Sequence, residues 1–385
     1  MPQAIRAILP GATLGILGGG QLGRMMALSA RSLGYEVHVL DPDPGCPARA
    51  VVDHVIAASF DDVDAAAELG RQCDVVTLEI EKVAVPGLRA AAHYAPVRPG
   101  ADVLEIVQDK GKQKRWLRDH GFPVGPFRDA RTAAEVQEAA TAFGGRCFVK
   151  SARGGYDGRG QVVLESAGGA ADAFRELGEA PVVVEQSLQL EAEISVLVAR
   201  SPSGELVVYP PALNHHENRI LEWSLLPGPV SRKVAAEAEE IGRGLAAKLS
   251  LEGLLAVELF VVDGDKLLVN ELAPRPHNTF HSTQVACVTS QFEQVVRAVC
   301  GLPLGSVEVL RPAAIANLLG DAGGPGAPFD QALAVPGTRL FLYGKRDARP
   351  GRKMGHLSAI GATPEEALAR VQAAKAKLTG AVAKQ

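Results

Sequence analysis

The first hundred residues alternate between short apolar runs and amphipathic stretches. Apolar runs occupy residues 12–17, 36–41 and 74–81. After each run the apolar residues have helical spacing. The three predicted helices start at Gln21, lie around 62–71 and lie near 85–93. Alternation of this kind is typical of a parallel sheet with helices on both faces. We therefore predict an α/β unit at the start of the chain.

The pattern changes after a helix predicted from Ala101 to about His120, which Gly121 and Pro123 should end. Apolar strands at 146–150 and 180–188, with a helix at 170–177, indicate a small α+β unit. A β-rich stretch, a helix at 231–249 and a hairpin with Asp263-Gly264 at its tip follow. The tail predicts strands at 337–345 and 355–361 and a last helix capped by Thr363, Pro364 and Glu366. The predicted fold class is thus mixed α/β and α+β.

Composition narrows the class of protein. The 385 residues are 47% hydrophobic and 22% charged, with a formal charge of −4, so neither nucleic acid nor a membrane is an expected partner. The five cysteines form no C-x-x-C pair, which argues against a disulfide framework or a zinc site and favours a reducing cytoplasm. No apolar run is long enough to predict a transmembrane helix.

The stretch ILGGGQLGRM fits the G-x-G-x-x-G dinucleotide fingerprint with Gly18, Gly20 and Gly23. Asp41 lies 18 positions after Gly23, at the end of the second apolar run. The fingerprint leaves a nicotinamide or flavin oxidoreductase open as one interpretation.

A second glycine turn, RGGYDGRG at 153–160, follows the strand that ends at Lys150. Four glycines let backbone N–H groups face a ligand, and Arg153 and Arg159 add positive charge, which suits phosphate. Lys110 could supply a further cation. The alternatives are a flexible hairpin tip and solvated lysines, and a Walker A loop is excluded because its motif is absent.

The hairpin around Asp263-Gly264 carries two carboxylates. A two-residue turn would place Glu258 opposite Val269 and diagonal to Glu271 on one face, about 7 to 8 Å apart at Cα. Carboxylates on an apolar hairpin are costly unless paired or bound to a cation, and oxygen ligands favour magnesium. Simple solvation of both residues is the alternative.

Two further segments carry charge. Arg275 and His277 follow the carboxylates directly in NELAPRPHN, and either could serve an anionic substrate or be structural. The basic turn RPGRKMGH at 349–356 would also suit an anion.

Taken in order, these motifs resemble the ATP-grasp superfamily. Within it the chain is similar to the 5-(carboxyamino)imidazole ribonucleotide synthase family, through GGGQLGRM, DPDP, EIE, GGYDGRGQ, VEQSL, VNELAPRPHNT, TSQFEQ and RPGRKMGHL. The resemblance implies a Rossmann-like pre-ATP-grasp domain at 1–105, an ATP-grasp domain at 106–310 with its small lobe at about 120–188, and a small C-terminal domain at 311–385. It also implies a homodimer.

The resemblance further implies the reaction. ATP, bicarbonate and 5-aminoimidazole ribonucleotide would give the carbamate product, ADP and phosphate, by way of carboxyphosphate in a closed, dry cleft. The implied ATP contacts are Lys110, Lys150, Gly155, Tyr156, Asp157, Gly158, Arg159, Gly160, Gln161, Glu185, Gln186, Ser187, Leu188, Glu193, His216, Asn270 and Glu271.

Magnesium would be held by Glu258 and Glu271. The implied residues on the bicarbonate and ribonucleotide side are Tyr156, Asp157, Arg159, Arg275, His277, Asn278 and Lys353, with Gln21, Leu22, Glu79, Glu81 and Arg352 binding the substrate.

Two departures from the family pattern concern the substrate pocket. HNTFH places Thr279 and Phe280 where the family commonly has Ser-Gly, and Lys82 follows EIE where Asn or His is usual. The competing interpretations are another ATP-grasp ligase, such as the formate-dependent glycinamide ribonucleotide formyltransferase, and a non-catalytic nucleotide-binding regulator. The latter would leave Glu258 and Glu271 unexplained.

Overall fold

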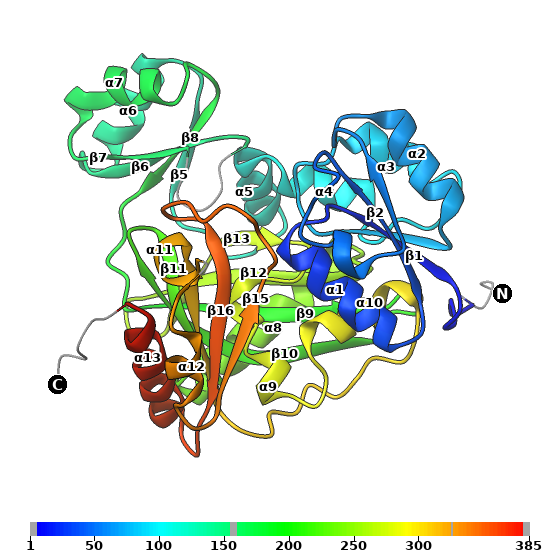
Figure 1. Ribbon diagram of the computed structural model, residues 1–385. Coiled ribbons are helices and arrows are strands. Elements are labelled where there is room, and N and C mark those ends of the chain that lie inside the picture. Colours follow the sequence, from blue (N-terminus) through cyan, green and yellow to red (C-terminus); the bar gives the residue numbers. More distant parts are fainter. Residues whose placement is uncertain (1–5, 155–159, 325, 380–385) are drawn as a thin grey trace.

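The computed structural model describes residues 6–154, 160–324 and 326–379. Its N-terminal unit, at the upper right of Figure 1, contains a parallel sheet in the order β3-β2-β1-β4. The predicted α/β alternation is confirmed. The elements of this unit are β1 (Thr13–Leu17), α1 (Gln21–Ser32), β2 (Glu36–Asp41), η1 (Arg49–Val51), β3 (His54–Ala57), α2 (Val63–Gln72), β4 (Val75–Leu78) and α3 (Val85–Ala91).

The single helix predicted from Ala101 to about His120 is wrong. Two helices occupy this stretch, α4 (Ala101–Val107) and α5 (Lys110–Asp119). The break is at Asp109, which has extended backbone geometry and accepts a hydrogen bond from the Lys112 N–H at 2.9 Å. An aspartate that caps a new helix competes with continuation of the preceding one.

A small lobe stands apart at the upper left of Figure 1 and is the predicted α+β unit. Its antiparallel sheet has the order β5-β8-β6-β7, and two helices cover one face around a separate apolar core. The elements are β5 (Phe127–Ala130), α6 (Ala133–Ala142), β6 (Cys147–Ser151), β7 (Gln161–Leu164), η2 (Ala167–Gly169), α7 (Ala170–Glu176) and β8 (Val182–Gln186).

An eight-stranded antiparallel sheet forms the largest part of the molecule, in the order β13-β12-β9-β10-β11-β14-β16-β15. The strands of the C-terminal segment therefore continue the sheet of the middle segment, while the predicted boundaries of the three domains stay a prediction. The strands are β9 (Ala192–Arg200), β10 (Leu206–Glu217), β11 (Ile220–Leu226), β12 (Gly253–Val262), β13 (Lys266–Ala273), β14 (Ala313–Leu319), β15 (Thr338–Leu342) and β16 (Lys353–Ile360).

The register predicted for the β12–β13 hairpin is also wrong. Val262 pairs with Lys266, so the turn has three residues, and a β-bulge lies at Asn270. Glu258 consequently pairs directly with Glu271 and not with Val269. The bulge adds one residue to one strand and so changes the pairing beyond it. The predicted placement of both carboxylates on one face is confirmed.

Helices cover both faces of the large sheet. On one face α8 packs against β9, β10, β12 and β13, while α13 packs against the C-terminal strands. On the other face α10 joins the sheet to α1 of the N-terminal unit. The helices of this part are α8 (Arg232–Lys248), η3 (Asn278–Phe280), α9 (Thr283–Ala286), α10 (Gln291–Cys300), α11 (Gly320–Gly323), α12 (Phe329–Leu333) and α13 (Pro364–Thr379).

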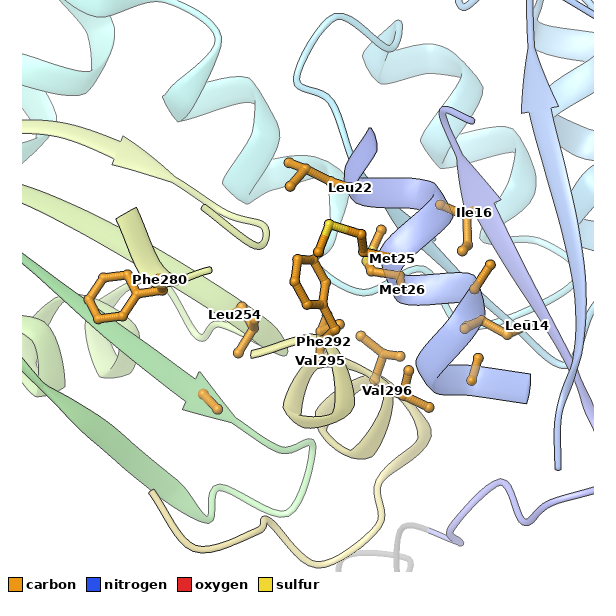
Figure 2. Close-up of a cluster of buried hydrophobic side chains, with 14 of the residues drawn as sticks. Leu14, Ile16, Leu22, Met25, Met26, Leu254, Phe280, Phe292, Val295 and Val296 are labelled. Carbon is orange, nitrogen blue, oxygen red and sulfur yellow. The ribbon is translucent and has the colours of Figure 1, made fainter. Parts of the chain in front are cut away.

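One continuous core holds the N-terminal unit against the large sheet. Figure 2 shows Met25 and Met26 of α1 facing Phe292 and Val296 of α10, with Leu254 of β12 beyond them. Because these side chains are almost fully buried, the two units are held in a fixed relation. No helix in the described part of the chain is both long enough and apolar enough to span a bilayer.

Candidate active site

A cavity of about 1430 Å³ lies where the N-terminal unit, the small lobe and the large sheet meet. It is large enough for a nucleotide and a second substrate, because single-ligand pockets are usually about 300 to 1,000 Å³. The predicted site residues that line it are Gln21, Leu22, Glu79, Glu81, Lys110, Lys150, Gly160, Gln161, Glu185, Gln186, Ser187, Leu188, Glu193, His216, Glu258, Asn270, Glu271, Arg275, His277, Asn278 and Lys353.

The facing carboxylates of Glu258 and Glu271 have different partners. Lys110 Nζ donates to Glu271 Oε1 at 2.8 Å, and Asn270 Nδ2 donates to Glu258 Oε2 at 3.2 Å. Burial and the Glu271 charge raise the pKa of Glu258. Burial also acts to raise the pKa of Glu271, but the lysines, Lys110 foremost, outweigh it and the net shift is downward. The pair therefore has an excess of negative charge on its Glu258 side.

This donor set fits a magnesium ion. Two partly buried carboxylates share one face, and the charge of Glu271 acts on the pKa of Glu258. Among the described residues no three His, Cys, Asp or Glu side chains are grouped to hold a metal. Magnesium commonly takes one or two protein carboxylates and completes its shell with phosphate and water.

Three charged residues link the small lobe to α5. Glu185 of β8 lies 2.9 Å from Lys150 Nζ and 3.3 Å from Lys114 Nζ. Burial acts to raise the pKa of Glu185, but Lys114 and Lys150 outweigh it, so the net shift is downward. Sequence reasoning missed Lys114, which is 4% exposed and lies one helical turn after Lys110. The i, i+4 spacing that puts both lysines on one face of α5 was the available signal.

A histidine–glutamate pair borders the cavity from the central strands. His216 Nδ1 of β10 lies 2.8 Å from Glu193 Oε2 of β9. Burial acts to lower the pKa of His216, but Glu193 outweighs it and the net shift is upward. The two residues predicted for the nucleotide pocket therefore lie together.

The opposite wall comes from the N-terminal unit and the C-terminal segment. Arg275 Nε lies 2.7 Å from Glu81 Oε1, so the loop after β13 is bridged to the loop after β4. Lys345 Nζ donates to Gln21 Oε1 at 2.7 Å and to the Lys353 carbonyl at 2.6 Å. Sequence reasoning missed Lys345, because no motif marks it although it lines the cavity.

The first glycine turn binds the protein's own carboxylates. Glu79 accepts from the N–H groups of Gly20 and Gly23 at 2.7 and 2.8 Å, and Asp41 Oδ2 accepts from the Gly19 N–H at 2.8 Å. A Cβ on Gly20 would lie 2.4 Å from Glu79 Oε1, which explains the glycine there. These N–H groups at the start of α1 are therefore engaged, and the dinucleotide interpretation has no pyrophosphate site in this turn.

Two of the three residues that depart from the family pattern, Lys82 and Thr279, line the cavity, and Phe280 does not. The Thr279 hydroxyl lies 2.9 Å from His277 Nδ1, so the hydroxyl of the usual serine is retained. Phe280 points into the apolar core, where it is fully buried near Tyr209. Lys82 lines the cavity.

One predicted substrate residue lies away from this wall. Arg352 does not line the cavity and donates to the Asp347 carbonyl at 3.0 Å. The predicted residues Gly155, Tyr156, Asp157, Gly158 and Arg159 lie outside the described residues.

Three known domains match the chain in succession. A ribonucleotide synthetase preATP-grasp domain matches residues 11–108, an ATP-grasp domain 115–292, and a phosphoribosylaminoimidazole carboxylase C-terminal domain 313–370. These three matches follow the same order as the three predicted domains.

Full-length relatives match as well. The chain is 39% identical to N5-carboxyaminoimidazole ribonucleotide synthase of Bacillus subtilis, over 91% of this chain and 92% of that protein. The ADP complex of an N5-carboxyaminoimidazole ribonucleotide synthetase superimposes with a TM-score of 0.92 at 40% identity, covering 96% and 98% of the two chains. The Aspergillus clavatus synthase in complex with ADP and 5-aminoimidazole ribonucleotide gives 0.88 at 31%, covering 95% and 98%.

Proposed function

The chain belongs to the N5-carboxyaminoimidazole ribonucleotide synthases of the ATP-grasp superfamily, and from this premise we propose how its residues divide the work. It is an ATP-dependent ligase that converts 5-aminoimidazole ribonucleotide in purine biosynthesis, using ATP and bicarbonate. N5-carboxyaminoimidazole ribonucleotide is the 5-(carboxyamino)imidazole ribonucleotide of the sequence interpretation.

The observation that carries the assignment of roles is that one cavity joins two unlike walls. Lysines and paired carboxylates form the first wall, which suits nucleotide phosphates. The second wall holds Gln21, the Glu81–Arg275 pair and Lys345, which suits an anionic ribonucleotide. The two substrates would therefore meet between the walls.

On the first wall, Lys110 and Lys150 would bind the ATP phosphates, and Gln186 to Leu188 at the end of β8 would line the adenine. Glu193 would contact the ribose, with His216 holding its carboxylate in place. Glu258 and Glu271 would hold magnesium, which neutralises phosphate charge when bound. Gly155 to Gln161 would complete the phosphate contacts.

The chemical step would begin with attack of a bicarbonate oxygen on the γ-phosphorus of ATP, releasing ADP. The carboxyphosphate so formed would break its C–O bond to give carbon dioxide and phosphate. The substrate amine would then attack the carbon and lose a proton. Arg275, His277, Asn278 and Lys353, with Tyr156, Asp157 and Arg159, would bind the anionic intermediates. Gln21, Leu22, Glu79 and Glu81, which line the cavity, would hold the ribonucleotide.

The test is ADP release by the purified protein with each substrate pair. Release should require both bicarbonate and 5-aminoimidazole ribonucleotide. Glycinamide ribonucleotide with formate is the matched alternative pair, and turnover dependent on that pair would contradict the assignment. Omission of magnesium should abolish turnover if Glu258 and Glu271 bind the ion.

The resemblance also leads us to propose a homodimer that acts in the cytoplasm. Light scattering coupled to size exclusion would measure the mass in solution, and a mass near 40.3 kDa, that of one chain, would contradict the dimer.

A further inference from the structure

Gln291, the first residue of α10, has no solvent exposure and no contact with the cavity, yet its side chain is bonded to a cavity residue. Its Oε1 accepts from the His277 N–H at 2.8 Å, and its Nε2 donates to the His277 carbonyl at 2.9 Å. Both main-chain polar groups of His277 are thus held by one amide.

The orientation of this amide is determined by its partners. A main-chain N–H can only donate and a carbonyl can only accept, so Oε1 and Nε2 cannot be exchanged. The second proton of Nε2 points to His281 Nδ1, 2.9 Å away. His281 is fully buried, and burial lowers its pKa well below the ordinary value, so the neutral ring accepts this bond.

The His277 ring, which is carried by this main chain, contacts two other side chains. Its Nδ1 lies 2.9 Å from the Thr279 hydroxyl, and its Nε2 lies 3.6 Å from Glu258 Oε1. A change in the main chain at residue 277 would therefore move the ring relative to Glu258 without removing any group that faces the cavity.

We propose that Gln291 is a positioning residue of the carboxylation reaction, which sets the place of His277 by holding both of its main-chain polar groups. The inference rests on the proposed role of His277. It adds a residue that reaches the reacting groups only through another side chain.

The chain contains a matched control on the same helix. Gln294 also has no solvent exposure, and its amide makes the same two bonds to one residue, donating to the Gly305 carbonyl at 2.9 Å and accepting from the Gly305 N–H at 2.8 Å. Gly305 does not line the cavity. Gln291→Glu and Gln294→Glu therefore disturb equivalent structures, and only the first one holds a site residue.

The experiment measures kcat and the KM for ATP of wild type, Gln291→Glu, Gln294→Glu, His277→Ala and the double variant Gln291→Glu/His277→Ala. Gln291→Glu should lower kcat at least tenfold with KM within about threefold, while Gln294→Glu should stay within about twofold of wild type. In the His277→Ala background, Gln291→Glu should change kcat less than twofold, because the residue through which it acts is gone.

The proposal would be overturned if the loss of kcat in the double variant equalled the product of the losses in the two single variants. A wild-type kcat in Gln291→Glu would overturn it as well. Gln291→Met, of similar size and uncharged, replaces the glutamate variant if that protein does not fold. Hydrogen exchange of the His277 main-chain amide can be measured in the wild type, without a variant. Fast, unprotected exchange would contradict the two hydrogen bonds between Gln291 and the main chain of His277. An inactive wild type would refute the proposed function instead, and normal turnover by His277→Ala would overturn both the role of that histidine and the inference that rests on it.

Discussion

Glu258 and Glu271 face each other across two strands and have pKa shifts of opposite sign. The pKa of Glu271 is lowered by the lysines, foremost Lys110, which donates to it, whereas burial and the Glu271 charge raise the pKa of Glu258. A cation bound between the carboxylates would remove the excess negative charge on the Glu258 side. Since Lys110 is also a predicted phosphate ligand, one lysine connects the metal site to the nucleotide.

We expect Glu271→Gln to abolish turnover and leave the fold intact. The amide keeps the size of the side chain but removes the charge that attracts both Lys110 and magnesium. Steady-state ADP release and circular dichroism would measure the two effects. Glu240→Gln, at an exposed position on α8, is the control and should behave as wild type. Near-normal activity of Glu271→Gln would place the metal elsewhere.

Lys114→Met should raise the KM for ATP at least fivefold and lower the melting temperature. The substitution leaves Glu185 buried with Lys150 as its one remaining ion-pair partner among the described residues. Loss of one member of a buried pair typically costs about 3 to 5 kcal/mol. The double variant Lys114→Met/Glu185→Gln removes the uncompensated charge and should recover part of the melting temperature. Equal melting temperatures for the two variants would contradict this account.

The predictability of the site residues depends on whether a motif marks them. Lys150 was found because it ends a strand just before a glycine-rich turn, and Lys110 was assigned by the resemblance to the family. Lys114 lies in a run of charges, Lys345 contacts Gln21 far away in the chain, and Gln291 contacts His277, which lies before η3, 14 positions earlier. Such contacts depend on how the units pack, which no local pattern encodes.

At the scale of elements, the turn before α1 fits the dinucleotide fingerprint, but its N–H groups bind carboxylates of the protein itself. Its glycines are needed because Glu79 and the backbone approach closely, and not because a dinucleotide does. The helix break at Asp109 and the bulge at Asn270 were missed for a related reason. In each case one residue changes the geometry while the apolar pattern around it continues.

Gly23→Ala should lower the melting temperature and raise the KM for the ribonucleotide. A Cβ on Gly23 would lie 2.4 Å from the Gly18 carbonyl oxygen, so the turn must open and move Gln21, which borders the cavity. Thermal melting and steady-state kinetics would measure both effects. Gly100→Ala, at the N-terminus of α4, has its nearest contact at 4.0 Å and should change neither quantity appreciably. An unaffected KM in Gly23→Ala would separate this turn from substrate binding.

At the scale of the whole molecule, the alternation of apolar runs was enough to predict the parallel unit and the small lobe. It could not show that the C-terminal strands join the large sheet, because strand pairing between distant segments leaves no local signal. His356 of β16 is buried against His281, which follows η3 and is also buried, and their ring centroids are 4.6 Å apart.

These two histidines should make the folded protein sensitive to acid. Burial lowers the pKa of both, for His356 to about 3, whereas histidines in an unfolded chain titrate near about 6.5. Below pH about 6.5 the unfolded state therefore binds more protons than the folded state. As the pH decreases, the free energy of unfolding falls by about 1.4 kcal/mol per pH unit for each such histidine, until the folded state titrates as well.

His356→Asn should reduce the drop in melting temperature between pH 7.5 and pH 5, whatever it does to the melting temperature itself. Scanning calorimetry at the two pH values would measure the drop. The exposed His93→Asn is the control and should leave it unchanged. An equal drop in His356→Asn and wild type would show that this histidine does not contribute to acid sensitivity.

The continuous sheet also has a consequence for biosynthesis on the ribosome. Strand β11 can pair with β14 only when residues 313–319 have been made. Strand β14 in turn pairs with β16, at residues 353–360. A nascent chain that already carries the residues proposed to bind ATP thus still has an open sheet edge, which is prone to pair with other chains. Residues 313–360 close this edge and bring Lys345 to Gln21, so the second substrate wall is completed only after these residues have been made.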